Sequence, residues 1–271
     1  MISIRQVVPA LLVLTTTAAA PARAQQAMEI VVNIPAGRLD VNQGGERIRS
    51  YPVSVGTAAH ATPTRQAGIT RMVWNPSWTP PDSEWARDER PAGPGWNNPM
   101  GRVKMHLFED YYVHGTPARN ERFLGRPASH GCIRMRNEDV MELARLVLTA
   151  DGAPVSTETI DRLAANPRQT REMRLNGRVR VRIEYRLAEL EQDSVALHPD
   201  VYGRAAGRYA ARVQHELSAL GQDATVVERM AITRSPGTAL RIARSGPAPV
   251  REVPVRAMPA AAAADVVAVL R

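Results

Sequence analysis

The sequence contains a single cysteine, Cys132, which stands two residues after His130 and 18 residues after His114. A thiol attacks a carbonyl carbon as its thiolate, so a cysteine at neutral pH needs a base or a positively charged neighbourhood. His114 could supply that base if the fold brings the two side chains together, which the spacing alone does not establish. The residues therefore suggest nucleophilic chemistry at a carbonyl group.

The residues around Cys132 add two features that such chemistry would use. Gly131 permits a tight turn, in which the backbone N–H groups of His130, Gly131 and Cys132 could converge to form an oxyanion hole. Arg134 follows two residues later, so in an extended segment its side chain would share a face with Cys132. There it could hold a carboxylate or favour the thiolate.

Other interpretations of these residues remain open at this point. A lone cysteine is commonly a small buried apolar residue, and a histidine after a strand is commonly structural. A metal site is not expected, because His-x-Cys with one distant histidine lacks paired ligand spacing and a fourth ligand. The other four histidines stand alone in the sequence: His60, His106, His198 and His215.

Composition bounds the class of protein. The chain has 271 residues, 44% of them hydrophobic, and a formal charge of +8 in which Lys104 is the only lysine. This is enough for one well-buried core with an appendage, or for two small domains. A basic surface suits polyanions such as acidic cell-wall polymers. No nucleic-acid-binding motif accompanies it, so nucleic acid is not an expected partner.

Residues 1–24 have the pattern of a secretory signal peptide. Arg5 precedes an apolar stretch at 7–14, and Ala22-Arg23-Ala24 fits a cleavage site. The apolar stretch is shorter than the ~20 residues of a membrane span, although an uncleaved anchor remains an alternative. We expect export across the inner membrane to the periplasm or cell envelope, with no transmembrane span after cleavage. In that oxidising compartment an unpaired cysteine is either buried or used.

The first half of the sequence predicts short strands. Apolar and polar residues alternate over 29–57, with turns at Gly37 and Gly44, and strands are expected at 69–74, 103–108 and 111–114. The fold class is therefore mainly β.

A proline- and glycine-rich loop separates these strands and carries or adjoins all four tryptophans. Those side chains, Trp78 and Trp96 among them, either fix the loop to the body of the protein or line a substrate groove.

After Met135 the hydrophobic period changes to that of a helix. A helix is predicted from Asn137, as its N-cap, to Asp151, followed by a short helix, a strand at 179–185 and a helix near 205–221. We divide the chain into the signal peptide, a catalytic domain at 28–150, an extension at 151–220 whose strand and helix pack on the core, and a linker or partly disordered tail at 221–271.

Two motifs together carry a family resemblance. "HGT" at 114–116, followed by "SHGCIRM" at 129–135, resembles the signature of the L,D-transpeptidase catalytic domain (YkuD-type) family, which remodels bacterial peptidoglycan. "NPMG" at 98–101, "YPVSVGT" at 51–57 and "WTPP" at 78–81 agree with it. The resemblance spans about 30–147, and a looser match covers 180–204.

The resemblance implies a β-sandwich or open barrel with a few short helices, and here a helical or irregular C-terminal extension. It implies Cys132 as the nucleophile, His114 as its base and the Gly115 carbonyl as the group that orients His114. His130 and Gly131 would shape the oxyanion site. The residues expected to contact substrate are Arg134, Ser129, Thr116, Trp78 and Trp96.

The implied reaction is acyl transfer without metal or organic cofactor. Cys132 would attack the carbonyl of the diaminopimelate residue in a tetrapeptide stem, expel the terminal D-alanine and form a thioester. An amine of another peptidoglycan stem, or of an envelope protein, would then resolve the thioester. Two alternatives stay open: a hydrolase of the same fold (an L,D-carboxypeptidase or amidase), and a non-catalytic wall-binding protein.

Overall fold

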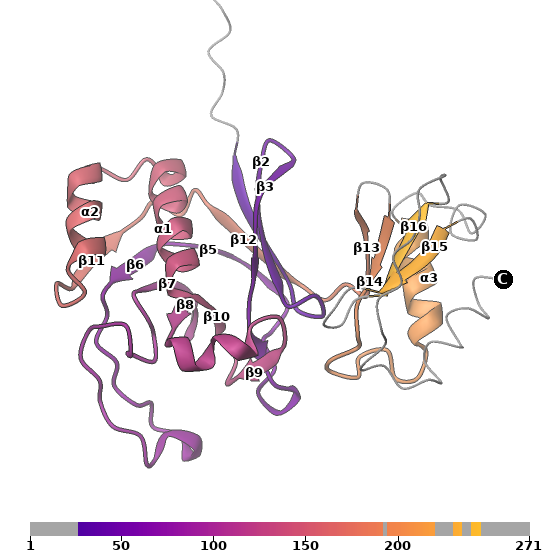
Figure 1. The fold of residues 1–271 in the computed structure, drawn as a ribbon, viewed down its shortest axis with the longest axis horizontal. Coiled ribbons are helices and arrows are strands. Elements are labelled where there is room, and N and C mark those ends of the chain that lie inside the picture. Colours follow the sequence, from indigo (N-terminus) through magenta and orange to yellow (C-terminus); the bar gives the residue numbers. More distant parts are fainter. Residues whose placement is uncertain (1–26, 192–193, 220–229, 235–239, 245–271) are drawn as a thin grey trace, which may run out of the picture.

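The computed structural model describes residues 27–191, 194–219, 230–234 and 240–244, which form two units joined at 185–187 (Figure 1). The predicted signal peptide lies outside these residues. The larger unit, the first unit, covers 27–184 and is mostly strands with few short helices, which confirms the predicted fold class. None of the helices in the described ranges is long and apolar enough to span a membrane.

The first unit contains two five-stranded sheets and one pair of short strands. In the order of pairing, the first sheet consists of β3 (Glu46–Pro52), β2 (Arg38–Gln43), β1 (Met28–Asn33), β12 (Arg180–Glu184) and β5 (Arg65–Gly68). The second consists of β10 (Ile133–Arg136), β8 (Tyr111–Thr116), β7 (Val103–Phe108), β6 (Arg71–Trp74) and β11 (Arg171–Arg174). The short pair is β4 (Val55–Gly56) with β9 (Pro127–Ser129).

Strand β7 shows how the sequence pattern builds the second sheet. Its residues alternate between a buried face, formed by Val103, Met105 and Leu107, and a less buried face that includes Lys104 and His106. Successive side chains of a strand point to opposite sides, so one face joins the core while the other is left for the site.

Two α-helices and three 3-10 helices complete the first unit: α1 (Asn137–Asp151), α2 (Thr157–Ala165), η1 (Ala58–His60), η2 (Glu84–Ala86) and η3 (Ala118–Phe123). Helix α1 packs on β7, β8 and β10 and buries Val140, Leu143 and Val147. It ends where predicted, because Gly152 adopts the left-handed conformation that closes a helix.

The boundary predicted at residue 150 cuts through both sheets. Strand β12 pairs in parallel with β1 and antiparallel with β5, so it lies inside the first sheet. Strand β11 likewise pairs with β6 at the edge of the second. Alternation in the sequence indicates a half-buried strand at 180–184, but pairing with a strand about 150 residues away is set only by the tertiary fold.

The second unit, residues 188–244, differs from the helical or irregular extension that we expected. It is a four-stranded antiparallel sheet of β13 (Ala188–Glu191), β14 (Ser194–Leu197), β16 (Leu240–Arg244) and β15 (Met230–Arg234), with helix α3 (Tyr209–Ala219) packed on it. Its apolar core includes Val195, Val213 and Leu217, together with Leu187 of the joining segment. Strands β15 and β16 fall in the predicted linker or tail, and the rest of that segment lies outside the described residues.

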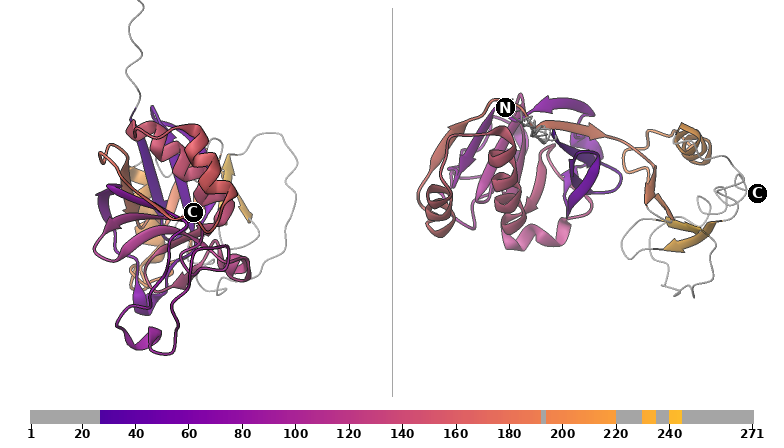
Figure 2. Two further views of the ribbon diagram at one scale, coloured as in Figure 1. Left: turned by 90° about the vertical axis from the view of Figure 1, so that its left-hand side faces the viewer. Right: turned by 90° about the horizontal axis from the view of Figure 1, so that it is seen from above.

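The two units lie side by side (Figure 2). Arg38 of β2 binds Glu189 of β13 at 2.8 Å, and Asn33 of β1 donates to the carbonyl of Arg186 at 3.1 Å. Polar groups at the end of the first sheet thus contribute to the contact between the units, to which Val201 and Tyr202 add packing against the core of the first unit.

Candidate active site

Three neighbouring strands of the second sheet place three side chains in one row. Strand β8 lies between β10 and β7, and His114 of β8 is paired with Arg134 on one side and with Lys104 on the other. Side chains at paired positions point to the same face of a sheet. The imidazole of His114 thus lies between two cationic side chains.

Cys132 opens onto the same space as this row. It immediately precedes β10, where Ile133 is paired with Val113, so it lies level with Tyr112. Cys132, Tyr112, His114, Lys104 and Arg134 all line one cavity of about 990 Å³, and Cys132 is half-buried. The structure therefore brings the cysteine and the upstream histidine to one cavity that solvent can enter.

His114 is held in one tautomer. It is buried, and its Nδ1 lies 2.6 Å from the carbonyl oxygen of Gly115, which can only accept a hydrogen bond. Nδ1 therefore carries the proton, and Nε2 is left as an acceptor. Burial lowers the pKa of His114 to about 3, and the charges of Arg134 and Lys104 act in the same direction. The imidazole is thus neutral at physiological pH.

Gly115 has no room for a side chain. A Cβ at this position would collide with the side chain of Asn137. Asn137 is the first residue of α1 rather than the predicted N-cap, and its Oδ1 accepts from the N–H of Arg102 at 2.8 Å. Its side chain therefore fastens the start of α1 to the loop before β7 and to the end of β8.

The thiol of Cys132 is neutral in this environment. Burial raises its pKa, and the backbone amide of Tyr112 and the charge of Arg134 only partly oppose this effect. Sγ donates a weak hydrogen bond to the carbonyl of Asp110 at 3.5 Å. The two side chains are consequently a neutral thiol and a neutral imidazole, not a thiolate and an imidazolium.

The turn before Cys132 is fixed from within. Ser129 Oγ donates to the carbonyl of Cys132 at 2.6 Å and accepts from the N–H of Gly131 at 3.1 Å. Gly131 has a φ of +114°, which favours glycine, and its carbonyl accepts from Thr62 Oγ1 at 2.7 Å. The Gly131 N–H that we expected to serve the oxyanion site is therefore used to hold the turn.

Three of the expected substrate contacts do not lie on the cavity wall formed by the described residues. Ser129 is buried inside the turn. Thr116 is also buried, and its carbonyl accepts from Asn137 Nδ2 at 3.0 Å. Trp96 packs against the guanidinium of Arg102 at 4.5 Å. Ser129 and Thr116 were singled out because they lie in the motifs, but both are buried, whereas Trp96 is exposed outside this wall.

Two aromatic rings and His130 form the mouth of the cavity. Trp78 lines it as expected, and so does Trp85, which the sequence did not separate from the other tryptophans. The Trp85 ring stacks on the His130 ring with centroids 4.2 Å apart, and His60 packs against His130 at 4.8 Å. Residues of the long loop and of η1 therefore pack against His130, in the turn that precedes Cys132.

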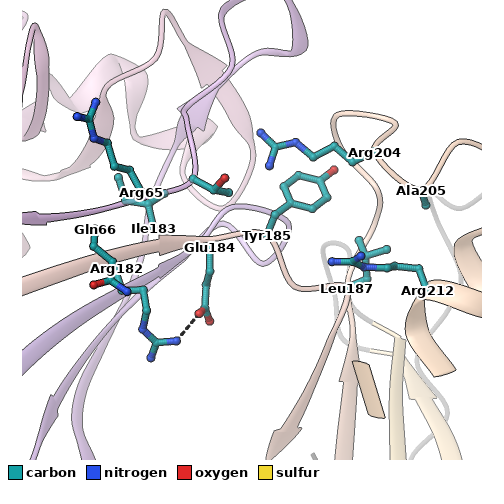
Figure 3. Close-up of a pocket in the computed structure, with 11 residues that line it drawn as sticks. Arg65, Gln66, Arg182, Ile183, Glu184, Tyr185, Leu187, Arg204, Ala205 and Arg212 are labelled. Carbon is teal, nitrogen blue, oxygen red and sulfur yellow. Dashed lines mark hydrogen bonds and ion pairs between the residues drawn. The ribbon is translucent and has the colours of Figure 1, made fainter. Parts of the chain in front are cut away.

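A second cavity, of about 580 Å³, lies where β12 leaves the first sheet (Figure 3). Most of its arginines have carboxylate partners: Arg65 with Glu109, Arg182 with Glu184, and Arg212 with Glu216. Arg204 lies over the rings of Tyr185 and Tyr202. No cysteine or histidine lines this cavity. Within the described ranges no three His, Cys, Asp or Glu side chains are placed to hold a metal ion.

Comparisons with known proteins identify relatives of this chain. Residues 27–181 match the family model of the L,D-transpeptidase catalytic domain. A Fuscovulum blasticum protein named as an L,D-transpeptidase in an ATP synthase subunits region is 40% identical over 107 residues, covering 38% of this chain and 55% of its own length. A Salmonella typhimurium protein named as the L,D-transpeptidase ErfK/SrfK is 33% identical over 147 residues, covering 49% and 44%. This chain thus spans about half the length of these relatives.

Among solved structures, an L,D-transpeptidase from Mycobacterium smegmatis matches 59% of each chain at 19% identity, with a TM-score of 0.36.

Proposed function

Since this chain belongs to the L,D-transpeptidase catalytic domain family, we propose that it forms cross-links in peptidoglycan through a thioester on Cys132. The observation that carries the proposal is the shared cavity of Cys132 and His114, in which the imidazole is neutral and presents Nε2 as an acceptor. A half-buried thiol next to such a base has what acyl transfer requires.

In the acylation step, Cys132 Sγ attacks the carbonyl carbon of the third residue of a tetrapeptide stem while His114 Nε2 takes the thiol proton. A bond forms between sulfur and carbon, and the bond from that carbon to the nitrogen of the terminal D-alanine breaks. His114 returns the proton to this nitrogen as it leaves. The products are free D-alanine and the thioester.

In the second step, an acceptor amine attacks the thioester carbonyl. His114 takes a proton from the amine, the new amide bond replaces the carbon–sulfur bond, and the proton returns to Cys132. The thioester retains the acyl-transfer potential of the bond just broken, so cross-linking proceeds without nucleotide. Arg134 flanks the site and stabilises the negative charge that develops at the carbonyl oxygen.

Because the substrate is peptidoglycan, we place the reaction in the cell envelope. Export would follow from the signal peptide predicted at 1–24. An envelope protein is a second candidate acceptor, since the second step requires only an amine that can enter the cavity.

Product analysis with the full chain tests this function. Disaccharide tetrapeptides incubated with the protein should give free D-alanine and a dimer whose mass equals two monomers less one D-alanine. The Cys132→Ala variant should give neither product while keeping the circular dichroism spectrum and melting temperature of the unaltered protein. Tripeptide monomers without dimers would replace the transferase by a hydrolase, and the absence of both products would overturn the proposal.

A second readout isolates the first step. A carbapenem presents a strained cyclic amide to the same nucleophile, and its ring-opened form should add to the protein as one covalent adduct in the intact mass. The adduct should be absent from Cys132→Ala. An adduct on both proteins would show that another group reacts and would contradict the assignment of the nucleophile.

A further inference from the structure

Lys104 is the only lysine of the chain, and the fold places it on the wall of the Cys132 cavity. Its neighbours in β7, Val103 and Met105, point into the core, so Lys104 points to the opposite face. On that face it is paired across the ladder with His114, and its ammonium lies 5.4 Å from the centre of the Tyr112 ring. The position is therefore fixed by strand register rather than by a mobile loop.

The ammonium of Lys104 has no carboxylate partner among the described residues within ion-pair distance. Lys104 is half-buried, and the nearby charge of Arg71 repels its ammonium. Glu172 and the ionised form of Cys132 attract the ammonium, but neither forms a salt bridge with it. A cation that loses part of its hydration without gaining an anion is costly unless a ligand supplies the anion. The environment of Lys104 thus calls for a negatively charged group inside the cavity.

The order of the strands indicates which group of the substrate this is. Cys132 precedes β10, His114 is on β8, and Lys104 is on β7, each one strand further along the sheet. In the proposed reaction His114 must protonate the leaving nitrogen, so that nitrogen lies over β8. The group that follows this nitrogen in the leaving residue then lies over the neighbouring strand, β7. The spacing between neighbouring strands, about 4.8 Å, is close to the spacing of about 3.8 Å between consecutive residues of a peptide.

That next group is the terminal carboxylate of the donor stem. Arg134 is on β10, on the opposite side of His114 and two residues after Cys132, and its Nη1 donates to the carbonyl of Ala128 at 3.3 Å. Arg134 is therefore placed toward the acyl part of the substrate. Lys104 alone of the two cations lies on the side of the leaving group.

Resting on the proposed function, we propose that Lys104 binds the terminal carboxylate of the donor stem and so selects stems that end at the fourth residue. In a stem with a fifth residue, this carboxylate is replaced by a neutral amide and the chain continues into the space of Lys104. Such a stem cannot form the ion pair, and its fifth residue clashes with the side chain of Lys104. Lys104 is thus a specificity-determining residue that sets donor length.

The test measures binding separately from turnover. Calorimetry on the full chain with Cys132→Ala compares a tetrapeptide stem with the same stem carrying a C-terminal amide. The free acid should bind about ten- to a hundredfold more tightly, as expected of a charge-assisted hydrogen bond. Adding Lys104→Met should reduce this ratio to about one, and adding Lys104→Arg should restore most of it.

Arg71→Gln serves as the matched control, because Arg71 is the cation near Lys104 that is not on the cavity wall. It should leave the ratio unchanged. In the active enzyme, Lys104→Met should raise KM for the tetrapeptide more than it lowers kcat and should make tetrapeptide and pentapeptide donors nearly equal.

The outcomes separate the two proposals. If the unaltered protein turns over tetrapeptides but the preference for the free acid survives Lys104→Met, the role of Lys104 is wrong and the proposed function stands. If the Cys132→Ala protein does not distinguish acid from amide, the role of Lys104 is also wrong. If no product and no carbapenem adduct forms on the unaltered protein, the proposed function itself fails.

Discussion

Two buried histidines, one in each unit, have opposite surroundings. His114 and His198 are both 3% exposed. His198 Nε2 lies 2.8 Å from Glu189 Oε2, and the same carboxylate binds Arg38 at 2.8 Å. His114 instead donates to a backbone carbonyl and lies between the cations Arg134 and Lys104.

The difference shows how environment separates a structural imidazole from a reactive one. Burial alone would raise the pKa of Glu189, but the hydrogen bond from His198 and the charge of Arg38 lower it to about 2. Its charge therefore persists and ties the two units together. Around His114 the same burial acts with two cations and no anion, so the imidazole stays neutral and its Nε2 is ready to accept a proton.

The largest effect should come from exchanging each histidine for glutamine. His114→Gln keeps a side chain that can bond to the Gly115 carbonyl but removes the base, so carbapenem acylation should slow by about 10²- to 10⁴-fold. His198→Gln should change this rate less than threefold. Stopped-flow measurements give the rate of carbapenem acylation for both variants. A comparable loss of rate in His198→Gln would contradict the distinction between the two histidines.

Removing the cation from the cluster around Glu189 should mainly affect stability. Arg38→Met removes the guanidinium shared by the buried Asp40 and the half-buried Glu189 and should lower the free energy of unfolding by about 3 kcal/mol. Arg145→Met, which breaks an exposed pair with Asp161, should cost less than about 1 kcal/mol. Urea denaturation monitored by circular dichroism measures both. Equal losses of unfolding free energy in the two variants would mean that the ion pairs of Arg38 stabilise the protein no more than an exposed pair does.

The two regions should respond to acid in different pH windows. The pKa of His114 is about 3 in the folded state against 6.5 in an unfolded chain, so the unfolded state binds more protons between these values. Stability should therefore fall as pH drops from 6.5 to 3, by at most about 1.4 kcal/mol per pH unit. Glu189, at about 2 against 4.5, has the same sign but acts between pH 4.5 and 2.

Unfolding free energies measured against pH would separate these contributions. His114→Gln should flatten the upper window and Glu189→Gln the lower one. The carbapenem acylation rate should also show no protonation step of His114 between pH 7 and 5, because the base is already neutral. A step near pH 6.5 that disappears in His114→Gln would contradict a depressed pKa.

The smallest effect should come from the contact through which the second unit reaches the active site. The Tyr202 hydroxyl donates to the carbonyl of Gly56 at 2.8 Å and accepts from the N–H of Thr62 at 3.1 Å, and Thr62 in turn holds Gly131. Tyr202→Phe should slow acylation about three- to tenfold, the equivalent of one hydrogen bond.

Tyr209→Phe removes a hydroxyl that donates to the carbonyl of His198 at 2.6 Å, away from the turn that precedes Cys132. It should leave the acylation rate unchanged. If both tyrosine variants behave alike, the second unit supports the active site only through general stability.

Much of the fold followed from local pattern. Alternation at Val103, Met105 and Leu107 identified β7, and the helical period with Gly152 identified α1 and its end. These signals are local, because side-chain direction repeats every two residues in a strand and every 3.6 in a helix. The strands β15 and β16 were missed, since they join the sheet only through the pairing of β16 with β14, a segment more than 40 residues away.

The site divides in the same way. The motif around Cys132 and the upstream His114 led to the family, and the structure brings those two residues to one cavity. Ser129 and Thr116 lie in the same motifs but are buried supports, because a short segment alternates between the cavity and the core. Lys104 lies outside these motifs, so the sequence did not point to it. Its proposed role rests on its ladder position opposite His114.

The sequence by itself determined which groups can react, the strand and helix periods, and the family. Only the tertiary structure decided that His114 lies between two cations, that β12 belongs to the first sheet, and that His198 is held by a carboxylate. The physical reason is that charge, burial and register depend on residues distant in the chain. A linear pattern can name a histidine, but the groups packed around it set its protonation state.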